Sequence, residues 1–191
     1  GYDCLEKNIK ITRYREVKSQ DGLQYQLVFN ITPFYPEGGG QVGDTGVIQS
    51  SNEKITILNT RRENKLIIHL TDNLPKEIAS NFVAKVNTVN RKASARNHTA
   101  THLLHESLRT ILGNHVVQKG SLVNPTYLRF DFTHFSKIEE SDLQKIEKDV
   151  NSKILANIAL NEHVNLPLDK AQGLGAIMLF EIGRASCRKR V

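Results

Sequence analysis

The sequence lacks long hydrophobic runs: no apolar stretch approaches the roughly 20 residues that a membrane-spanning helix needs. It also contains only two cysteines, Cys4 and Cys187, which argues against a disulfide-stabilised fold and suits a reducing compartment. The first residues are charged and have no apolar core, so no signal peptide is expected there. With 39% hydrophobic and 24% charged residues, the chain is typical of a globular, cytoplasmic protein without a membrane segment.

The positive charge of the chain is unevenly distributed. The formal net charge is +6, and the last eleven residues, EIGRASCRKRV, contribute half of it through four basic residues and one acidic residue. Codons for this segment can be chosen so that they closely resemble a common sequencing adapter. We therefore expect residues 181–191 to be a non-native tail, with a native basic tail as the alternative. Without the tail, charge alone does not indicate an RNA partner.

Residues 1–90 are predicted to form a small β-barrel subdomain. Segments rich in β-branched and aromatic residues, separated by polar turns, predict strands at residues 24–32, 47–49, 55–58 and 66–70. Short strands at this spacing are typical of a small barrel. Between the first two lies FYPEGGGQVGDTG, in which five of thirteen residues are glycine, too many for a regular element.

Residues 91–180 are predicted to form a second subdomain with helices on one face of an antiparallel sheet, so the fold class is α+β. Residues 91–112 have helical apolar spacing and end at Gly113. A second amphipathic helix is predicted at residues 141–156, and strands at 116–123, 128–132 and 159–166. On the second helix, one face carries the apolar residues Leu143, Ile146, Val150, Ile154 and Leu155.

Two histidines, His98 and His102, lie four residues apart in the first predicted helix and share one face of it. Such a pair can bind one Zn²⁺, although the alternative is a partly buried pair bonded to backbone carbonyls. A metalloprotease-type site is disfavoured because the residue after the first histidine is Thr99 instead of glutamate. His105 is expected to support this pair or to be a packed neutral residue. Zinc requires three or four protein ligands, so the pair alone is an incomplete site.

The glycine-rich segment can bring backbone N–H groups close to a phosphate or a carbonyl. It has neither the Gly-Lys-Ser/Thr of a P-loop nor the spacing of a dinucleotide-binding motif. The alternatives are an ordinary hairpin loop or a ligand-binding loop. In the second case, Gln41 and Asp44 are the polar side chains that the loop could direct at a ligand.

Four segments in fixed order carry a resemblance to a known family: FYPEGGGQVGD, RNHTATHLLHESLR, VVQKGSLV and LRFDF. They resemble the editing domain of alanyl-tRNA synthetase, and the match extends from residue 1 to about residue 180. Free-standing alanyl-tRNA editing proteins are related to it, and the editing domain of threonyl-tRNA synthetase shares the second half. The opening GYDCLE resembles the segment that links the two halves of a bacterial synthetase. We therefore expect a piece of a full synthetase, with a free-standing editing protein as the alternative.

The resemblance implies hydrolysis of the ester in mischarged Ser-tRNA(Ala) and Gly-tRNA(Ala). The implied partners are the acceptor end of tRNA(Ala) and, in cis, the rest of the synthetase. The implied cofactor is one Zn²⁺ per intact domain, which polarises water or the ester carbonyl. By position, the implied site residues are the zinc ligands His98 and His102, the pocket residues Thr101 and Gln118, and Gly39, Gly40 and Gln41 near the 3′ end of the tRNA. Within this set, Thr101 is implied to sense the hydroxyl group of serine.

The chain departs from the family in one respect: the family's other two zinc ligands come from a downstream Cys-Gly-Gly-Thr-His segment that this sequence lacks. We therefore expect weak or absent zinc binding and little hydrolysis from these residues alone, although the parent should do both. A non-catalytic tRNA-binding or structural fragment is the alternative. No segment resembles an adenylate site, so ligase activity and ATP binding are expected only of a longer parent.

Overall fold

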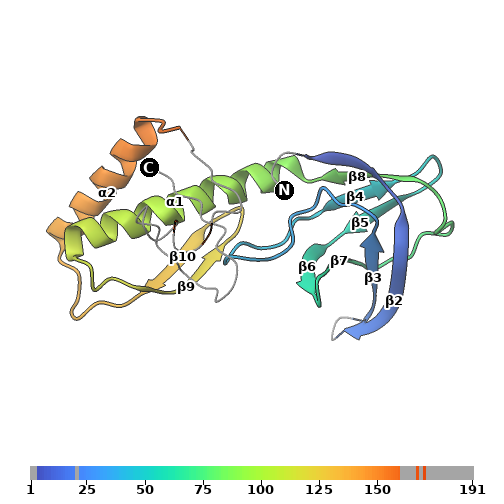
Figure 1. The fold of residues 1–191 in the computed structure, drawn as a ribbon, viewed down its shortest axis with the longest axis horizontal. Coiled ribbons are helices and arrows are strands. Elements are labelled where there is room, and N and C mark those ends of the chain that lie inside the picture. The colour runs from blue at the N-terminus through green and yellow to red at the C-terminus, as the bar shows by residue number, and fades with distance from the viewer. Residues whose placement is uncertain (1–3, 20–21, 160–166, 168–169, 171–191) are drawn as a thin grey trace. The chain divides into compact units, whose positions relative to one another are not determined.

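The computed structural model describes residues 4–19, 22–159, 167 and 170. In this part of the chain, strands and two helices confirm the predicted α+β class (Figure 1). The chain divides into two compact units. The first comprises Gly1–His98 and Leu122–Leu128, and the second comprises Thr99–Ser121 and Arg129–Val191.

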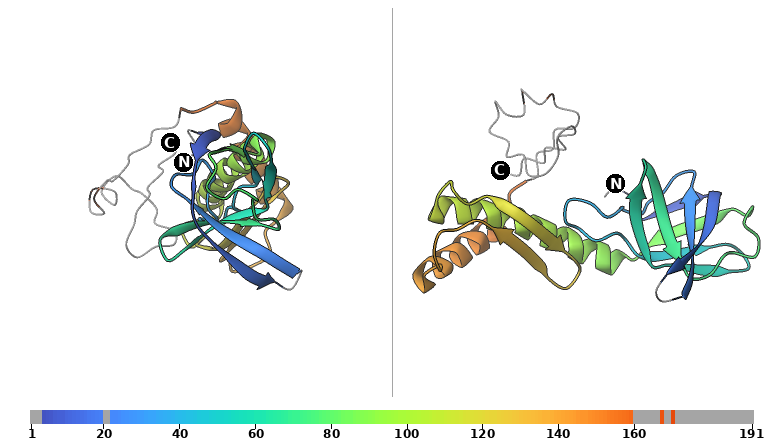
Figure 2. Two further views of the ribbon diagram at one scale, coloured as in Figure 1. Left: turned by 90° about the vertical axis from the view of Figure 1, so that its right-hand side faces the viewer. Right: turned by 90° about the horizontal axis from the view of Figure 1, so that it is seen from below.

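The first unit is built mainly of strands (Figure 2). They form two four-stranded antiparallel sheets, with strand orders β1-β8-β4-β5 and β2-β3-β7-β6. Their strands are β1 (Glu6–Ile9), β2 (Ile11–Ser19), β3 (Gly22–Phe29), β4 (Gly46–Gln49), β5 (Lys54–Ile57), β6 (Asn59–Glu63), β7 (Leu66–Thr71) and β8 (Phe82–Val86). Among the residues that the structure describes, the hydrogen-bonded strand pairs do not close into a ring. The expected small barrel is therefore present as two sheets without barrel closure.

The two sheets share one hydrophobic core, to which β5 and β8 contribute every second residue. The buried members of this core are Ile9, Leu27, Phe29, Phe34, Ile48, Ile55, Ile57, Phe82, Ala84 and Val86. Nine of them lie on or next to strands, whereas Phe34 opens the glycine-rich segment and is only 1% exposed. The core therefore anchors the start of that segment.

In this unit the predicted strands correspond to β3, β4, β5 and β7, whereas β1, β2, β6 and β8 were not predicted. Three of the four, β1, β2 and β6, are outermost in their sheets. An outermost strand is exposed along one side and tolerates charged residues, so its apolar periodicity is weak. The sequences ITRYREVKS of β2 and NTRRE of β6 show this composition.

Helix α1 (Thr88–Leu112) begins three residues before its predicted start. The reason is Asn87, whose side-chain oxygen accepts a hydrogen bond from the N–H of Asn90 at 3.1 Å and so caps the first turn. The helix ends at Gly113, whose φ of +113° is accessible to glycine at low cost. The division between the two units passes through α1 after His98.

In the second unit, residues of α1 and of α2 (Glu140–Leu155) pack against β10 (Leu128–Phe132), which pairs with β9 (Gln118–Val123) in a two-stranded sheet. Its core centres on Leu108, Val116 and Ile146, with Phe130, Phe132 and Val150 packed against them. The predicted apolar face of α2 is only partly correct: Ile146 and Val150 contribute to this core. Leu143, Ile154 and Leu155 are 44%, 51% and 84% exposed.

The predicted strand at residues 159–166 and the predicted tail at 181–191 fall almost entirely outside the described residues. Neither helix in the described part of the chain combines the length and the apolar character needed to cross a membrane.

Candidate functional site

The three consecutive glycines of the first unit form a tight turn. Gly38 and Gln41 exchange backbone hydrogen bonds, with the N–H of Gly38 donating to Gln41 O at 3.1 Å and the N–H of Gln41 donating to Gly38 O at 3.0 Å. The two central residues, Gly39 and Gly40, have φ of +59° and +78°. Positive φ at both central positions is the requirement of a type I′ turn, which explains glycine at both. The turn is closed by an isolated bridge between Gly38 and Gln41 that lies outside the named strands.

The residues after this turn pair with the segment Leu122–Leu128 of the same unit. Gln41 forms a parallel bridge with Val123. The N–H of Val123 donates to Gly40 O at 2.7 Å, and the N–H of Val42 donates to Val123 O at 3.0 Å. These bonds hold the backbone of the turn against VVQKGSLV, a second of the four motif segments.

The side chain of Gln41 is buried, with 1% of its surface exposed, and lies against helix α1. Its Oε1 is 2.8 Å from Nδ1 of His98. The turn also passes close to the same ring, because a methyl group on Gly39 would lie 3.8 Å from Cε1 of His98. The first unit therefore brings together three of the predicted site residues: Gly39, Gln41 and His98.

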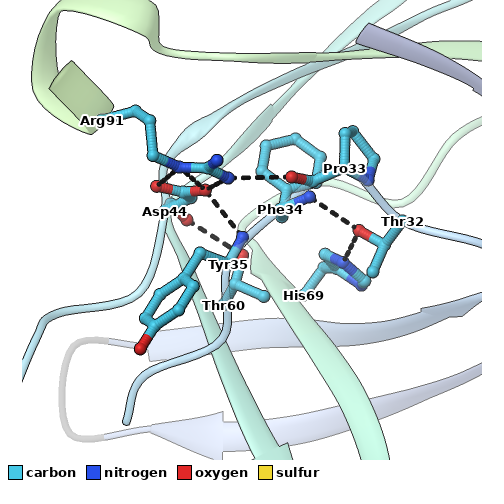
Figure 3. Close-up of polar contacts among 8 residues, drawn as sticks. All are labelled: Thr32, Pro33, Phe34, Tyr35, Asp44, Thr60, His69 and Arg91. Carbon is cyan, nitrogen blue, oxygen red and sulfur yellow. Dashed lines mark hydrogen bonds and ion pairs between the residues drawn. The ribbon is translucent and has the colours of Figure 1, made fainter. Parts of the chain in front are cut away.

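A buried ion pair anchors the end of the glycine-rich segment (Figure 3). Arg91, near the start of α1, donates from Nε to both carboxylate oxygens of Asp44, at 2.9 and 2.7 Å, and from Nη2 to Oδ2. The same guanidinium donates to Pro33 O at 2.8 Å. The side chains of Arg91 and Asp44 are only 3% and 6% exposed. Asp44 is thus a structural anchor, and the expectation that it points at a ligand is wrong.

Asp44 also ties together the two ends of the glycine-rich segment. The N–H of Tyr35 donates to its carboxylate at 2.7 Å. Its own N–H donates to Tyr35 O at 2.9 Å, and its carbonyl accepts from the hydroxyl of Thr60 at 2.9 Å. Residues 35 and 44 are therefore clamped to each other and to β6. The glycine turn between them starts and ends at fixed points.

A buried histidine holds the residues just before this clamp (Figure 3). His69 of β7 is fully buried and stacks on Phe29 with ring centroids 3.8 Å apart. Its Nδ1 donates to Leu27 O at 3.1 Å, so Nε2 accepts the hydroxyl proton of Thr32 at 2.8 Å. The Thr32 oxygen in turn accepts from the N–H of Phe34 at 3.1 Å. Burial lowers the pKa of His69 to about 4, so the ring is neutral at neutral pH.

The other predicted site residues lie in the second unit. Thr101 and His102 are on α1; the Thr101 side chain is buried and that of His102 is half-buried. Gln118 is the first residue of β9 and is 9% exposed. Because α1 is a continuous helix from 88 to 112, the four-residue spacing of His98 and His102 is helical, as predicted.

His105 is the packed neutral histidine that the sequence suggested. It is 4% exposed and lies 5.1 Å from Phe130 between ring centroids. Burial, with a smaller contribution from the positive charge of Arg109, lowers its pKa, and a hydrogen bond with the backbone of Val116 opposes the shift. It serves the core of the second unit.

The described residues contain no group of three or more His, Cys, Asp or Glu side chains that could hold a metal ion. Zinc binding by His98 and His102 stays a prediction, in which the two histidines would supply two of the three or four ligands that zinc requires. The hydrogen bond of His98 to an amide oxygen fits the same role, because metal-bound histidines commonly donate their other ring N–H to such an oxygen.

Sequence reasoning missed the residues that position the site: Arg91, Thr60 and His69. Arg91 and Asp44 are 47 residues apart, and no local pattern pairs them. Arg129 and Asp131 of β10, in contrast, form an exposed, solvated ion pair.

Comparison with known proteins shows similarity to tRNA synthetases. A family model described as class II (A) tRNA synthetases matches residues 1–92. The chain is 52% identical over 190 residues to an alanine–tRNA ligase of Flavobacterium psychrophilum, covering 94% of this chain and 21% of the relative. Ligases of the same name from Cytophaga hutchinsonii and Christiangramia forsetii are 52% and 53% identical over 180 and 182 residues. These two matches cover 20% and 21% of the relatives' own length, and each covers 94% of this chain.

The chain thus matches part of bacterial alanine–tRNA ligases and spans about a fifth of the length of the curated relatives it matches. This agrees with the synthetase part of the predicted resemblance. Editing, zinc dependence and the roles of the individual site residues stay predictions.

Proposed function

We propose that this chain is the editing portion of an alanyl-tRNA synthetase and that it hydrolyses the ester of Ser-tRNA(Ala) and Gly-tRNA(Ala). The observation that carries the proposal is the contact between two distant motifs: the buried side chain of Gln41 in the glycine turn lies 2.8 Å from the half-buried His98 of the HxxxH helix. The similarity to alanine–tRNA ligases supports the same assignment.

The chemical need for such a site follows from the size of alanine. A synthetic pocket shaped for a methyl side chain cannot strongly exclude glycine, and it rejects the added hydroxyl of serine only modestly. A second site with polar groups that pair with the hydroxyl discriminates in the opposite direction. Alanine is spared because it would leave those buried polar groups without a partner.

We assign Thr101 and Gln118 to this discrimination. Both side chains are buried, at 5% and 9% exposure, and both can donate and accept hydrogen bonds. The Thr101 hydroxyl is proposed to pair with the serine hydroxyl, and Gln118 to line the pocket. The backbone of Gly39 and Gly40 is proposed to receive the 3′ end of the tRNA, where the absence of side chains permits a close approach.

His98 and His102 are the residues that would hold zinc. When bound, zinc supplies a Lewis acid that polarises water or the ester carbonyl. Because the described residues provide two ligands, we expect weak zinc binding by the 191-residue chain and strong binding only with a downstream Cys and His.

The test is deacylation of Ser-tRNA(Ala), with Ala-tRNA(Ala) as the control substrate. It is run on the 191-residue chain and on a chain extended by the downstream Cys-Gly-Gly-Thr-His segment. We expect the extended chain to release serine and to spare alanine, and Thr101→Val to reduce that selectivity. Binding of tRNA by the extended chain without release of serine would contradict the proposal and favour the non-catalytic fragment. Full activity of the 191-residue chain would instead favour a free-standing editing protein.

A further inference from the structure

The contact between Gln41 and His98 determines which ring nitrogen of His98 carries the proton. An amide oxygen can accept a hydrogen bond but cannot donate one. Oε1 of Gln41 lies 2.8 Å from Nδ1 of His98, so Nδ1 must be the donor. In the neutral ring the lone pair is then on Nε2.

Gln41 is held so firmly that its side chain has little freedom to turn elsewhere. Its backbone N–H and C=O are both used within the Gly38–Gln41 turn, and its neighbours Gly40 and Val42 are bonded to Val123. The side chain is 1% exposed. A side chain buried to this extent does not touch an RNA, so an effect of Gln41 on RNA chemistry must pass through the residue that it contacts.

The rest of the glycine-rich segment explains how this contact is kept. The clamp between Tyr35 and Asp44 joins the two ends of the segment, and Arg91 ties Asp44 to the same helix that carries His98. Arg91 and His98 are seven residues apart on α1, which is two helical turns. The glycine-rich segment is therefore attached to α1 at two points, through Asp44 at Arg91 and through Gln41 at His98.

We infer that Gln41 is a positioning residue: its amide oxygen keeps the proton of His98 on Nδ1 and thereby presents Nε2 for metal binding. The statement about the His98 proton stands on the contact alone. The statement about the metal rests on the proposed function.

The first test measures the tautomer of His98 in the 191-residue chain without metal. Long-range proton–nitrogen NMR on ¹⁵N-labelled protein at neutral pH distinguishes protonated from unprotonated ring nitrogens, and the spectrum of His98→Gln assigns the His98 signals. We expect the Nδ1–H tautomer in the wild type. The Nε2–H tautomer in the wild type would overturn the inference, and this outcome requires no variant to fold.

The second test removes and then restores the acceptor. Gln41→Met keeps the size of the side chain and should shift His98 toward the Nε2–H tautomer, whereas Gln41→Glu keeps an acceptor and should preserve the wild-type signature. The matched control is Gln26→Met, which removes a buried glutamine of the same unit whose Oε1 accepts from Arg15 at 2.6 Å. It should leave His98 unchanged. A His98 tautomer that is the same in Gln41→Met and in the wild type would also overturn the inference.

Titration with Zn²⁺, followed on the ring resonances of His98, tests the part of the inference that concerns metal binding. Loss of a hydrogen-bond partner of a ligand typically weakens metal binding by about 10–100-fold, so Gln41→Met should bind zinc weaker by this factor and Gln26→Met should not. If Gln41→Met and the wild type bind zinc with equal affinity, the part of the inference that concerns metal binding is overturned. If the wild type shows the Nδ1–H tautomer but no zinc response in either the 191-residue or the extended chain, the metal site of the proposed function fails while the role of Gln41 toward His98 stands.

Discussion

Polar residues with almost no exposed surface position the candidate site. Arg91 and Asp44 form an ion pair that is withdrawn from water, and a bidentate contact of this kind is directional. A buried pair contributes little net stability compared with apolar residues, but removing one partner leaves a charge without compensation. The pair therefore matters for where the glycine-rich segment is held.

Breaking this pair should be costly. Asp44→Asn or Arg91→Met should each lower the free energy of unfolding by about 3–5 kcal/mol, because the remaining charge stays buried. The double variant should lose less than the sum of the two. Urea unfolding measures these values. The control is Arg129→Met, from a pair whose side chains are 64% and 45% exposed, and it should cost at most about 1 kcal/mol. A cost near the control value for Asp44→Asn would contradict the anchoring role.

His69 predicts a dependence of stability on pH. Its pKa is about 4 in the folded chain and 6.5 as an unperturbed residue, so the unfolded chain takes up the proton first as pH falls. Stability from the neutral ring is complete above pH 6.5 and is lost between pH 6.5 and 4. The loss amounts to roughly 3 kcal/mol at 1.36 kcal/mol for each pKa unit.

The measurement is the free energy of unfolding at several pH values for the wild type and for His69→Gln, which keeps polar groups but does not titrate. The free energy of unfolding of the wild type minus that of His69→Gln should fall as pH is lowered from 7 to 4. Protonation of the carboxylates affects both proteins alike, so it does not contribute to this difference. A difference that is independent of pH would show that His69 is protonated at the same pH in the folded and unfolded chains.

At the scale of elements, the glycine-rich segment requires glycine for two different reasons, backbone conformation and lack of space. Gly39 and Gly40 meet a conformational demand, since both adopt positive φ. Gly43 meets a demand for space: a methyl group there would lie 1.9 Å from the carbonyl oxygen of Thr60. The segment thus lies directly against β6 at the point where Asp44 is anchored.

Gly43→Ala should therefore force the segment away from β6. We expect a loss of about 1–3 kcal/mol in stability, as for other overpacked sites, and a weaker Gln41–His98 contact. Gly38→Ala is the matched control, because the nearest atom to a methyl group there is 3.7 Å away. It should change stability by no more than about 1 kcal/mol. Thermal melts compare the two variants, and equal melting temperatures would contradict the close approach of Gly43.

At the scale of the whole molecule, the chain corresponds to about a fifth of the length of its relatives, and its described residues contain no group of three or more side chains that could hold a metal ion. Extension by the downstream Cys-Gly-Gly-Thr-His segment should complete the site. Zinc at 100 times its dissociation constant stabilises a folded protein by about 2.7 kcal/mol. The melting temperature of the extended chain should therefore rise with zinc, and that of the 191-residue chain should not. An equal response of both chains would contradict the need for the downstream ligands.

Residue pattern alone was sufficient for the α+β class, for six of the strands (β3, β4, β5, β7, β9 and β10), for both helices and for the histidine spacing on α1. These features depend on local periodicity and on glycine as a helix stop, and both can be read along the chain. The outer strands β1, β2 and β6 were missed because solvent on one side relaxes the pattern that marks a strand.

The partners of single residues were decided by tertiary structure. Under the ligand-binding alternative, Asp44 was one of two side chains that the loop could direct at a ligand, yet the fold places it beside Arg91, 47 residues away. Gln41 was predicted to lie near a tRNA end, and the fold buries its side chain against His98. Hydrogen bonds and ion pairs act over about 3 Å in space and leave no periodic signal in sequence, so only packing of distant segments can reveal them.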